Sequence, residues 1–517
     1  MEPKKITYRI EKSRRGIDTI VVTSDGKNVP LHSRFDPERE ASTFGNRLDP
    51  DRYDLVIALG VGLGYHLVPL GERINEYYAV VLVDPLPELE EQIRNNPLTS
   101  FLVRSPKISL LSGKPVNEVV AFLSEILDMD RVRGISVLEH PASARLFNDY
   151  YSDIKKSIDD MITVRAGNKA TRHAFGRLFV RNIIKNFGLL GDAMPVRDLF
   201  GAFAGSPAVI AGSGPSLDGD LPSLAQYQER TFVVAVDSAL PALLGAGITP
   251  DIIVSVDPQP YVREHFMGSQ CDDAIRVFSI SSHPSVVSIM SGYFSLNSHP
   301  LSQLADEAYG GSIGSIDSAT GNVAGDAVDL CLKCGFSVIG ITGFDFSFSD
   351  FMIYARGTAY QRRYATYFQD RLATVETRNA SYIMTSSGGH RQEGRLTRKS
   401  FLHYRSALED YIGKNGVRNL RSLNDRGMSI FGVRAAGMEE LAAGSGTRAI
   451  DKRKAVNSVR ARSKRIGSGP LREAIAGTDD FMLKRLLDAS LGKDTGPGEI
   501  ARCRNLLATM ELRSRGK

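Results

Sequence analysis

The sequence has little of several features that mark particular classes of protein. Four cysteines in 517 residues are too few for a disulfide framework and favour a reducing compartment. A net charge of +5 is small for this length, so we expect no nucleic-acid partner. The N-terminal residues contain no signal-peptide core, and no apolar run elsewhere is long enough to span a bilayer. We therefore expect a cytoplasmic protein without stable membrane insertion.

Common catalytic and metal-binding motifs are missing as well. The absence of HExxH, GxSxG and GxxxxGK[ST] excludes the commonest zinc proteases, esterases and P-loop proteins. Cys331 and Cys334 have zinc-knuckle spacing, but Cys271 and Cys503 are far away in sequence, and the pattern around the pair is typical of a helix ending at Gly335. No DxD metal clamp follows the predicted strands. We expect no metal site.

Composition and length describe an ordinary globular protein of several domains. The chain is 42% hydrophobic and 24% charged, and its length favours about three domains. Apolar strands that end in glycine or acidic residues predict two Rossmann-like α/β domains, followed by a mainly helical C-terminal region. We expect an N-terminal domain over 1–150, a helical connector over 151–205, a central catalytic domain over 206–435 and a helical, basic region over 436–517.

The N-terminal domain carries a glycine turn between two apolar strands. The first strand runs into GVGLG at 60–64, and the second ends at Asp84. This βαβ pattern suits a nucleotide or S-adenosylmethionine, with Asp84 placed to bind a ribose hydroxyl. It also occurs in Rossmann-like domains that bind nothing, so both interpretations stand.

The central domain opens with PAVIAGSGPSLDGD, at 207–220, which reads as a buried strand, a tight turn and a helix start. The turn consists of Gly212, Ser213, Gly214, Pro215 and Ser216. Its glycines permit close backbone approach, its proline favours helix entry, and its serines supply hydroxyls beside helix N–H groups. Because it is short and has no lysine, we expect a site for one phosphate, as in a nucleoside monophosphate.

Three later strands of this domain end in acidic residues, namely Asp237, Asp257 and Asp345. The carboxyl ends of parallel strands meet at one edge of a sheet, where α/β proteins hold their ligands. We therefore expect these residues to line one crevice with the glycine turn.

Several segments resemble the motility accessory factor (Maf) family of flagellin glycosyltransferases. They are VIAGSGPSLDGDLPSL, ALLGAGITPDIIVSVD and ATGNVAGDAVDLCLKCGFSVIGITGFDFSFSD in the central domain. LHSRFDPEREA and GVGLGYHL resemble the family's N-terminal domain, and residues 408–432 resemble its closing segment. The turn also resembles that of bacterial CMP-sialic acid sialyltransferases. The resemblance implies an inverting, metal-independent transfer of a nonulosonic acid, such as pseudaminic or legionaminic acid, from its CMP form to Ser/Thr hydroxyls of flagellin, with no other cofactor.

The resemblance also implies roles for individual residues. The turn from Gly212 to Ser216 would hold the CMP phosphate. Asp237 and Asp257, where sialyltransferases use asparagines, would contact hydroxyls, and Thr320, Gly321 and Asp345 would complete the nucleotide site.

Such a site needs a general base and donors to the leaving phosphate. His390 is the candidate base. Tyr354 and Tyr360 are the candidate donors, with charge from Arg362 or Arg363.

Two alternatives follow from the same residues. The archaeal 6-hydroxymethylpterin diphosphokinases share this central domain, and such an activity would need Mg²⁺ held by Asp237, Asp257 or Asp345. A non-enzymatic flagellin-binding protein is the other alternative.

Three features lie beyond the central strands. We expect a polar loop over 385–394 and an amphipathic helix over 399–412. The basic run at 448–465 is either a solvated helix face or a site for an acidic partner.

Overall fold

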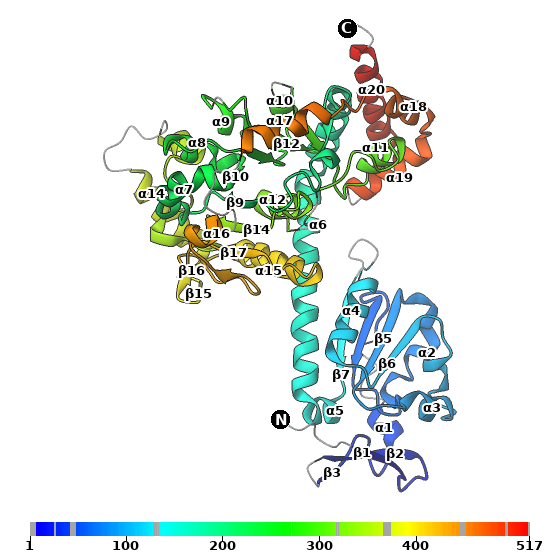
Figure 1. The fold of residues 1–517 in the computed structure, drawn as a ribbon. Coiled ribbons are helices and arrows are strands. Elements are labelled where there is room, and N and C mark those ends of the chain that lie inside the picture. The colour runs from blue at the N-terminus through cyan, green and yellow to red at the C-terminus, as the bar shows by residue number, and fades with distance from the viewer. Residues whose placement is uncertain are drawn as a thin grey trace. The chain divides into compact units, whose positions relative to one another are not determined.

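The structure is a computed structural model that describes residues 7–24, 27–41, 48–127, 132, 134–269, 271–288, 290, 292–316, 318, 320–365, 374–443, 451–491 and 495–514. The chain forms two compact units, Met1–Thr171 and Arg172–Lys517. It passes from one to the other within the long helix α6 (Asn148–Leu190), which occupies most of the expected connector (Figure 1).

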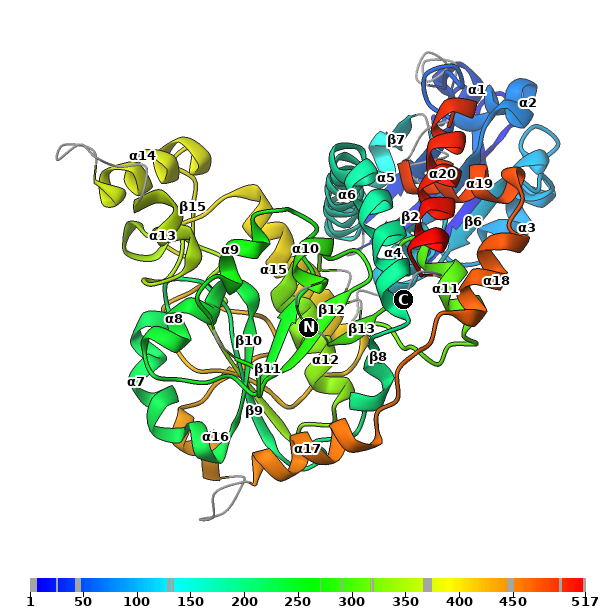
Figure 2. The same ribbon diagram turned by 90° about the horizontal axis from the view of Figure 1, so that it is seen from above.

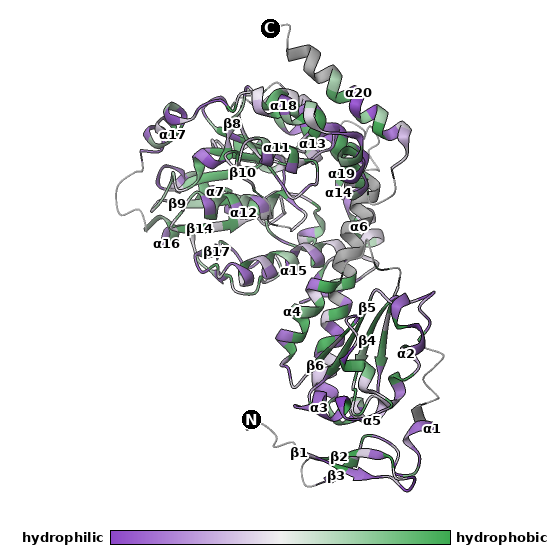
Figure 3. Cartoon of the chain, turned by 90° about the vertical axis from the view of Figure 1, so that its right-hand side faces the viewer, coloured by the Kyte–Doolittle hydropathy of each residue, from purple (hydrophilic) through white to green (hydrophobic). Residues whose placement is uncertain are grey.

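Unit 1 contains two sheets. The antiparallel one has the order β1-β2-β3, with β1 (Thr7–Lys12), β2 (Asp18–Ser24) and β3 (Lys27–Pro30). The parallel one has the order β6-β5-β4-β7, with β4 (Leu55–Leu59), β5 (Ala79–Asp84), β6 (Ile108–Ser112) and β7 (Ile135–Glu139). Its helices include α1 (Pro37–Ala41), α2 (Leu70–Arg73), α3 (Leu89–Arg94), α4 (Val116–Ile126) and α5 (Pro141–Leu146). All of β4 is buried, as expected for a parallel strand covered on both faces, and β4 and β5 are green in Figure 3.

Unit 2 is built on a nine-stranded sheet of order β18-β17-β14-β9-β10-β11-β12-β13-β8, in which all neighbours are parallel. The inner strands are β9 (Pro207–Ala211), β10 (Phe232–Val236), β11 (Ile252–Ser255), β12 (Ile275–Ser279), β13 (Tyr293–Ser295), β14 (Val338–Thr342) and β17 (Leu420–Ser422). Both edge strands, β8 (Met194–Pro195) and β18 (Arg434–Ala435), have two residues. The strand order reverses between β9 and β14, so the crevice beyond their carboxyl ends is where such a sheet holds a ligand.

Helices cover both faces of this sheet (Figure 2). On one side lie α12 (Val323–Lys333), against β9, β10 and β11, and α15 (Lys399–Lys414). On the other lie α7 (Leu217–Tyr227) and α16 (Met438–Ala443), which pack together. Shorter helices follow the other strands: α8 (Leu240–Gly245), α9 (Val262–Phe266), α10 (Pro284–Val287) and α11 (Ser302–Ala308).

A small satellite core follows β14. It comprises α13 (Ala359–Ala365), α14 (Val375–Ser387) and the hairpin of β15 (Arg391–Gln392) and β16 (Arg395–Leu396), packed around Phe348, Ile353, Ile383 and Leu396. The prediction of a polar loop over 385–394 is therefore wrong. Residues 385–387 complete α14, whose C-cap residue Gly388 has the left-handed conformation, and residues 391–394 belong to the hairpin. The glycines of this segment end a helix, and its polar residues lie on a two-residue strand.

The C-terminal region is helical, with α17 (Lys452–Arg462), α18 (Gly469–Gly477), α19 (Asp480–Leu491) and α20 (Pro497–Ser514). The predicted fold class is confirmed: two α/β units with parallel sheets and a helical C-terminal region. Within the described ranges, we find no helix with the length and apolar character needed to cross a membrane.

The basic segment at 448–465 makes contacts inside unit 2 within its described part. Lys452 Nζ forms an ion pair of 2.9 Å with Asp251 and donates to the carbonyl oxygens of Gln228 and Thr231. Arg460 donates to the carbonyl oxygens of residues 272–274. Although α17 is strongly hydrophilic (Figure 3), part of its charge holds the helix against the amino ends of the strands.

Candidate functional site

The crevice between β9 and β14 is closed by a clamp between Ser216 and Asp345. The Asp345 carboxylate accepts from the backbone N–H of Ser216, at 3.1 Å, and from its hydroxyl, at 2.9 Å. The same hydroxyl oxygen accepts from Gly343 N–H at 3.2 Å. Burial raises the pKa of Asp345 to about 6, although the hydrogen bonds from Ser216 oppose the shift. The clamp joins the glycine turn after β9 to the acidic residue after β14, two of the segments expected to form the site.

Close packing explains the glycines of the turn. Gly212 N–H donates to the Thr342 carbonyl at 2.8 Å, and Gly214 N–H donates to the Gly343 carbonyl at 3.0 Å. A Cβ on Gly214 would strike the Asp345 carboxylate. Three backbone N–H groups of the turn, those of Gly212, Gly214 and Ser216, are thus bonded within the protein. The Ser213 hydroxyl accepts from Ser238 at 3.0 Å and keeps its own proton for a ligand.

Beside the clamp, the strand ends of β10 and β11 place a buried acidic group. Asp237 is 2% exposed; its Oδ2 accepts from the Ser255 hydroxyl at 2.6 Å, and its Oδ1 lies 3.3 Å from His265 Nδ1. Asp257 accepts from Gln259 N–H at 2.8 Å, and burial raises its pKa to about 6. The pKa of Asp257 is raised further by the charge of Asp237, which brings the two acids into one electrostatic cluster.

His265 was not predicted as a site residue. It lies on α9, a helix of five residues, and it supplies a charged partner to Asp237. Burial by itself lowers the pKa of His265, but three neighbouring carboxylates outweigh it and raise that pKa above its ordinary value. They are those of Asp237, Asp257 and Glu264. A helix this short carries no periodicity that could have singled out the histidine.

The tyrosines lie in the satellite core near the acids. The rings of Tyr354 and Tyr360 are 4.7 Å apart, and Tyr354 packs against the satellite core. Burial raises the pKa of Tyr354, with the charge of Asp257 adding to the shift. Arg363 stacks on Tyr261, 5.0 Å from its ring centre, and lies 3.7 Å from Glu264. The side chain of Arg362 lies outside the described residues.

His390 is exposed on the turn between α14 and β15. Its backbone carbonyl accepts from Thr397 N–H at 3.1 Å, and the Thr397 hydroxyl donates to the Phe346 carbonyl at 2.7 Å. The hairpin that follows His390 is thereby attached to the loop after Asp345, while the imidazole itself faces solvent.

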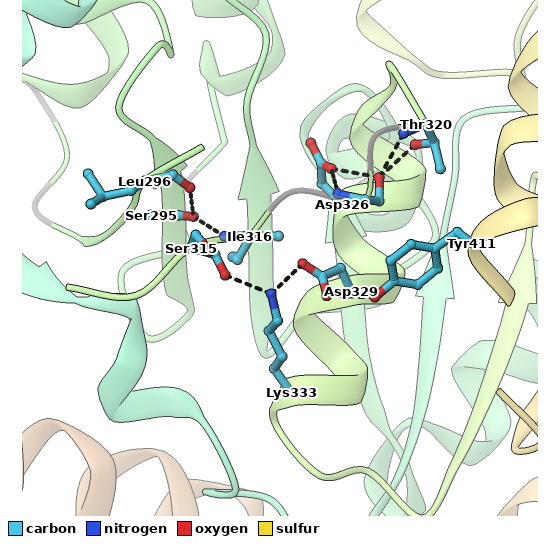
Figure 4. Close-up of polar contacts among 10 residues, drawn as sticks. Ser295, Leu296, Ser315, Ile316, Thr320, Asp326, Asp329, Lys333 and Tyr411 are labelled. Atoms are coloured by element: carbon cyan, nitrogen blue, oxygen red, sulfur yellow. Dashed lines mark hydrogen bonds and ion pairs between the residues drawn. The ribbon is translucent and has the colours of Figure 1, made fainter. Parts of the chain in front are cut away.

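Thr320 and Gly321 precede α12, and Thr320 belongs to a polar network (Figure 4). The Thr320 and Ser318 hydroxyls are 2.7 Å apart, and Ser318 donates to Asp326 at 2.8 Å. Gly321 has φ of +73°, which disfavours any side chain there.

The body of α12 is anchored by a buried acid (Figure 4). Asp329 accepts from Tyr411 of α15 at 2.6 Å and from Lys333 at 2.8 Å. Lys333 also donates to the Ser315 carbonyl at 2.8 Å. These bonds fix the helix whose N-terminus the nucleotide prediction uses.

A cavity of about 420 Å³ opens beside the clamp. Its lining includes Ser216, Gly343 and Asn424 but neither Asp237 nor Asp257. The acidic cluster is therefore not part of this cavity's lining.

The glycine turn of unit 1 is internally satisfied. Asp84 Oδ2 accepts from Val61 N–H at 2.8 Å and from Gly62 N–H at 3.0 Å, while His32 Nε2 accepts from Leu63 N–H at 2.8 Å. Asp84 Oδ1 accepts from Leu86 N–H at 3.0 Å. Both oxygens that could bind a ribose are thus engaged, which favours the ligand-free interpretation of this turn.

Over the ranges that the structure describes, we find no group of three or more His, Cys, Asp and Glu side chains arranged to hold a metal ion. Asp345 is bonded to Ser216, whereas Asp237 is bonded to Ser255 and paired with His265. Asp237 and Asp345 are therefore each engaged with protein partners.

Comparison with known proteins relates the chain to a family model and to a solved structure. Residues 181–351 match the model of the family described as 6-hydroxymethylpterin diphosphokinase MptE-like. The solved structure of the MAf glycosyltransferase from Magnetospirillum magneticum AMB-1 is similar over 99% of this chain and 87% of that one, with a TM-score of 0.63 and 14% identity.

Curated relatives from Treponema pallidum (strain Nichols) are each described as an uncharacterized protein. One is 27% identical over 230 residues, covering 43% of this chain and 74% of the relative. Another is 26% identical over 358 residues, covering 68% of this chain and 61% of the relative. The chain thus contains an MptE-like domain and, along almost its whole length, has the fold of the MAf glycosyltransferase structure.

Proposed function

We propose that the protein is a cytoplasmic glycosyltransferase that moves a nonulosonic acid from a CMP-activated donor to Ser/Thr hydroxyls of flagellin, and so serves motility. The observation that carries the proposal is the fold shared with a MAf glycosyltransferase over 99% of the chain. The acceptor, the donor and the sugar are assigned from the resemblance of the motifs quoted above.

The carboxyl edge of the large sheet, where β9, β10 and β11 end, offers chemistry that suits a sugar nucleotide. The Asp257 carboxylate has acceptor capacity left for a sugar hydroxyl, and the Ser213 hydroxyl has a proton to donate, whereas both oxygens of Asp237 are engaged by Ser255 and His265. In this proposal the protein positions donor and acceptor and stabilises the leaving phosphate, because transfer from an activated ketose passes through an oxocarbenium-like state.

The second candidate is the transfer of diphosphate from ATP to a pterin alcohol. It is favoured by the MptE-like match of residues 181–351, which contains the turn and all three strand-end acids. That reaction would use Mg²⁺ at carboxylates that are engaged with serine and histidine side chains.

Calorimetry with CMP and with ATP, each with and without Mg²⁺, separates the two candidates. The transferase predicts CMP binding that does not depend on Mg²⁺ and is weakened by Ser213→Ala, with Ser223→Ala as the matched control on α7. Binding of ATP alone, with a strict need for Mg²⁺, would overturn the transferase in favour of the diphosphokinase.

A further inference from the structure

Asp237 and His265 form a largely buried ion pair. Asp237 is held from two sides, by the Ser255 hydroxyl on Oδ2 and by His265 Nδ1, at 3.3 Å, on Oδ1. The contact is an ion pair that does not meet hydrogen-bond geometry at Nδ1, so Asp237 supplies a counter-charge to the imidazolium, and Nε2 is the nitrogen left to exchange a proton with a ligand. The His265 side chain keeps 14% exposure, and its partner Asp237 is followed by Ser238, whose hydroxyl donates to Ser213 of the glycine turn.

The groups that face His265 come from every element packed against α9. The end of β10 supplies Asp237, the loop after β11 supplies Asp257, and α9 itself supplies Glu264. From α13, Arg363 lies 3.7 Å from Glu264 and so offsets part of that carboxylate's charge. His283 precedes α10 and is occupied with Ser285, whereas α8 brings no titratable side chain. The surroundings therefore favour the imidazolium form.

We propose that His265, held by Asp237, donates a proton to the departing phosphate in this crevice. This assignment rests on the proposed glycosyl transfer. A site without a metal must meet the charge of the leaving group with protein donors, and a histidine is suited to do so because its protonation equilibrium lies near neutral pH.

In this step the bond between the anomeric carbon and the phosphate oxygen breaks, and the electron pair of that bond stays on the oxygen. The phosphate oxygen then takes a proton from Nε2 of His265. The acceptor hydroxyl forms the new bond to the anomeric carbon and loses its proton to a base, for which His390 is the candidate. His265 regains a proton from water after CMP leaves.

The first test follows transfer from CMP-N-acetylneuraminate against pH in wild type, His265→Asn and Asp237→Asn. Loss of a general acid typically costs about 10²-fold or more in kcat, and we expect this loss in His265→Asn with little change in KM. Wild-type kcat should fall as pH rises through the His265 pKa. Asp237→Asn should move that fall to lower pH, because the imidazolium loses its counter-charge.

His283→Asn is the matched control, since this histidine caps α10 and asparagine also caps helices. An unchanged kcat and pH profile in both His265→Asn and Asp237→Asn would overturn the assignment.

A second measurement separates this assignment from the proposed function. Histidine NMR signals of the full chain, titrated with CMP, report the His265 pKa directly. CMP binding that leaves this signal unchanged would overturn the role of His265 alone. Failure of the wild type to bind CMP would overturn the proposed function and, with it, this role.

Discussion

The carboxylate of Asp345 accepts hydrogen bonds from both the backbone N–H and the hydroxyl of Ser216, a residue 129 positions earlier. The contact joins the loops after β9 and β14, the two strands at which the order of the sheet reverses. The Ser216–Asp345 contact therefore stabilises the fold at the switch point of the sheet, which is where α/β proteins of this kind bind ligands.

The buried charge of Asp345 predicts a dependence of stability on pH. Its folded-state pKa of about 6 lies above the unfolded value of about 3.9, so the folded protein binds this proton more tightly. The resulting stabilisation is present below about pH 4 and is lost as pH rises through about 6. Between pH 4 and 7 we expect wild type to lose up to about 3 kcal/mol of unfolding free energy relative to Asp345→Asn.

Urea unfolding of unit 2 at pH 4 and pH 7 measures this difference. Asp192→Asn is the control, because Asp192 is 77% exposed. Parallel pH profiles for wild type and Asp345→Asn would contradict the prediction.

The ion pair between Lys452 and Asp251 predicts that α17 stabilises unit 2. The two side chains are 11% and 13% exposed, so Lys452→Met leaves a largely buried carboxylate without its cation. Removal of one partner of a buried pair costs about 3–5 kcal/mol. We expect a clear drop in the thermal unfolding temperature, and no drop for Lys454→Met, which replaces an exposed lysine on the same helix. Equal unfolding temperatures for the two variants would show that the pair contributes nothing.

The buried histidines of unit 1 predict sensitivity to acid. Burial lowers the pKa of His32 to about 3, well below the unfolded value of about 6.5. The unfolded chain then binds a proton that the folded one does not, so the stabilisation is complete above about pH 6.5 and is lost as pH falls. Protonation of Nε2 would also break its bond from Leu63 N–H.

At pH 5 we expect the unfolding free energy of wild type to be about 2 kcal/mol lower than above pH 6.5 because of His32. We expect His32→Gln to lack this decrease, because glutamine has no proton to gain. Unfolding of unit 1, followed by hydrogen exchange between pH 5 and 7, measures the difference. The control is His390→Gln, which replaces an exposed histidine. A His32→Gln profile as steep as that of wild type would rule out His32 as a source of the acid sensitivity.

Much of the fold could be predicted because parallel strands leave a clear local pattern. Runs such as the one at 207–211 are apolar throughout and stop at glycine or acid, which fixed both their type and the edge at which their ends meet. The structure places the Asp345 carboxylate beside the glycine turn, bonded to Ser216, and its role in binding a nucleotide stays a prediction.

The partners of the site's side chains could not be predicted from the sequence. The pairing of His265 with Asp237 depends on the position of a five-residue helix, and the closure of the GVGLG turn depends on His32, which precedes it by some thirty residues. His390 was chosen from its residue type and its place on a glycine-rich segment after the central strands, and neither could show which way its side chain faces. Its role, like those of Tyr354 and Tyr360, stays a prediction.

The two short edges of the large sheet have a consequence for the behaviour of the protein at high concentration. An edge strand recruits another chain through a continuous row of unpaired backbone groups. Both β8 and β18 have only two residues, and β8 includes a proline, which has no N–H to donate. Unit 2 therefore carries a broad parallel sheet whose ends are poor templates for aggregation.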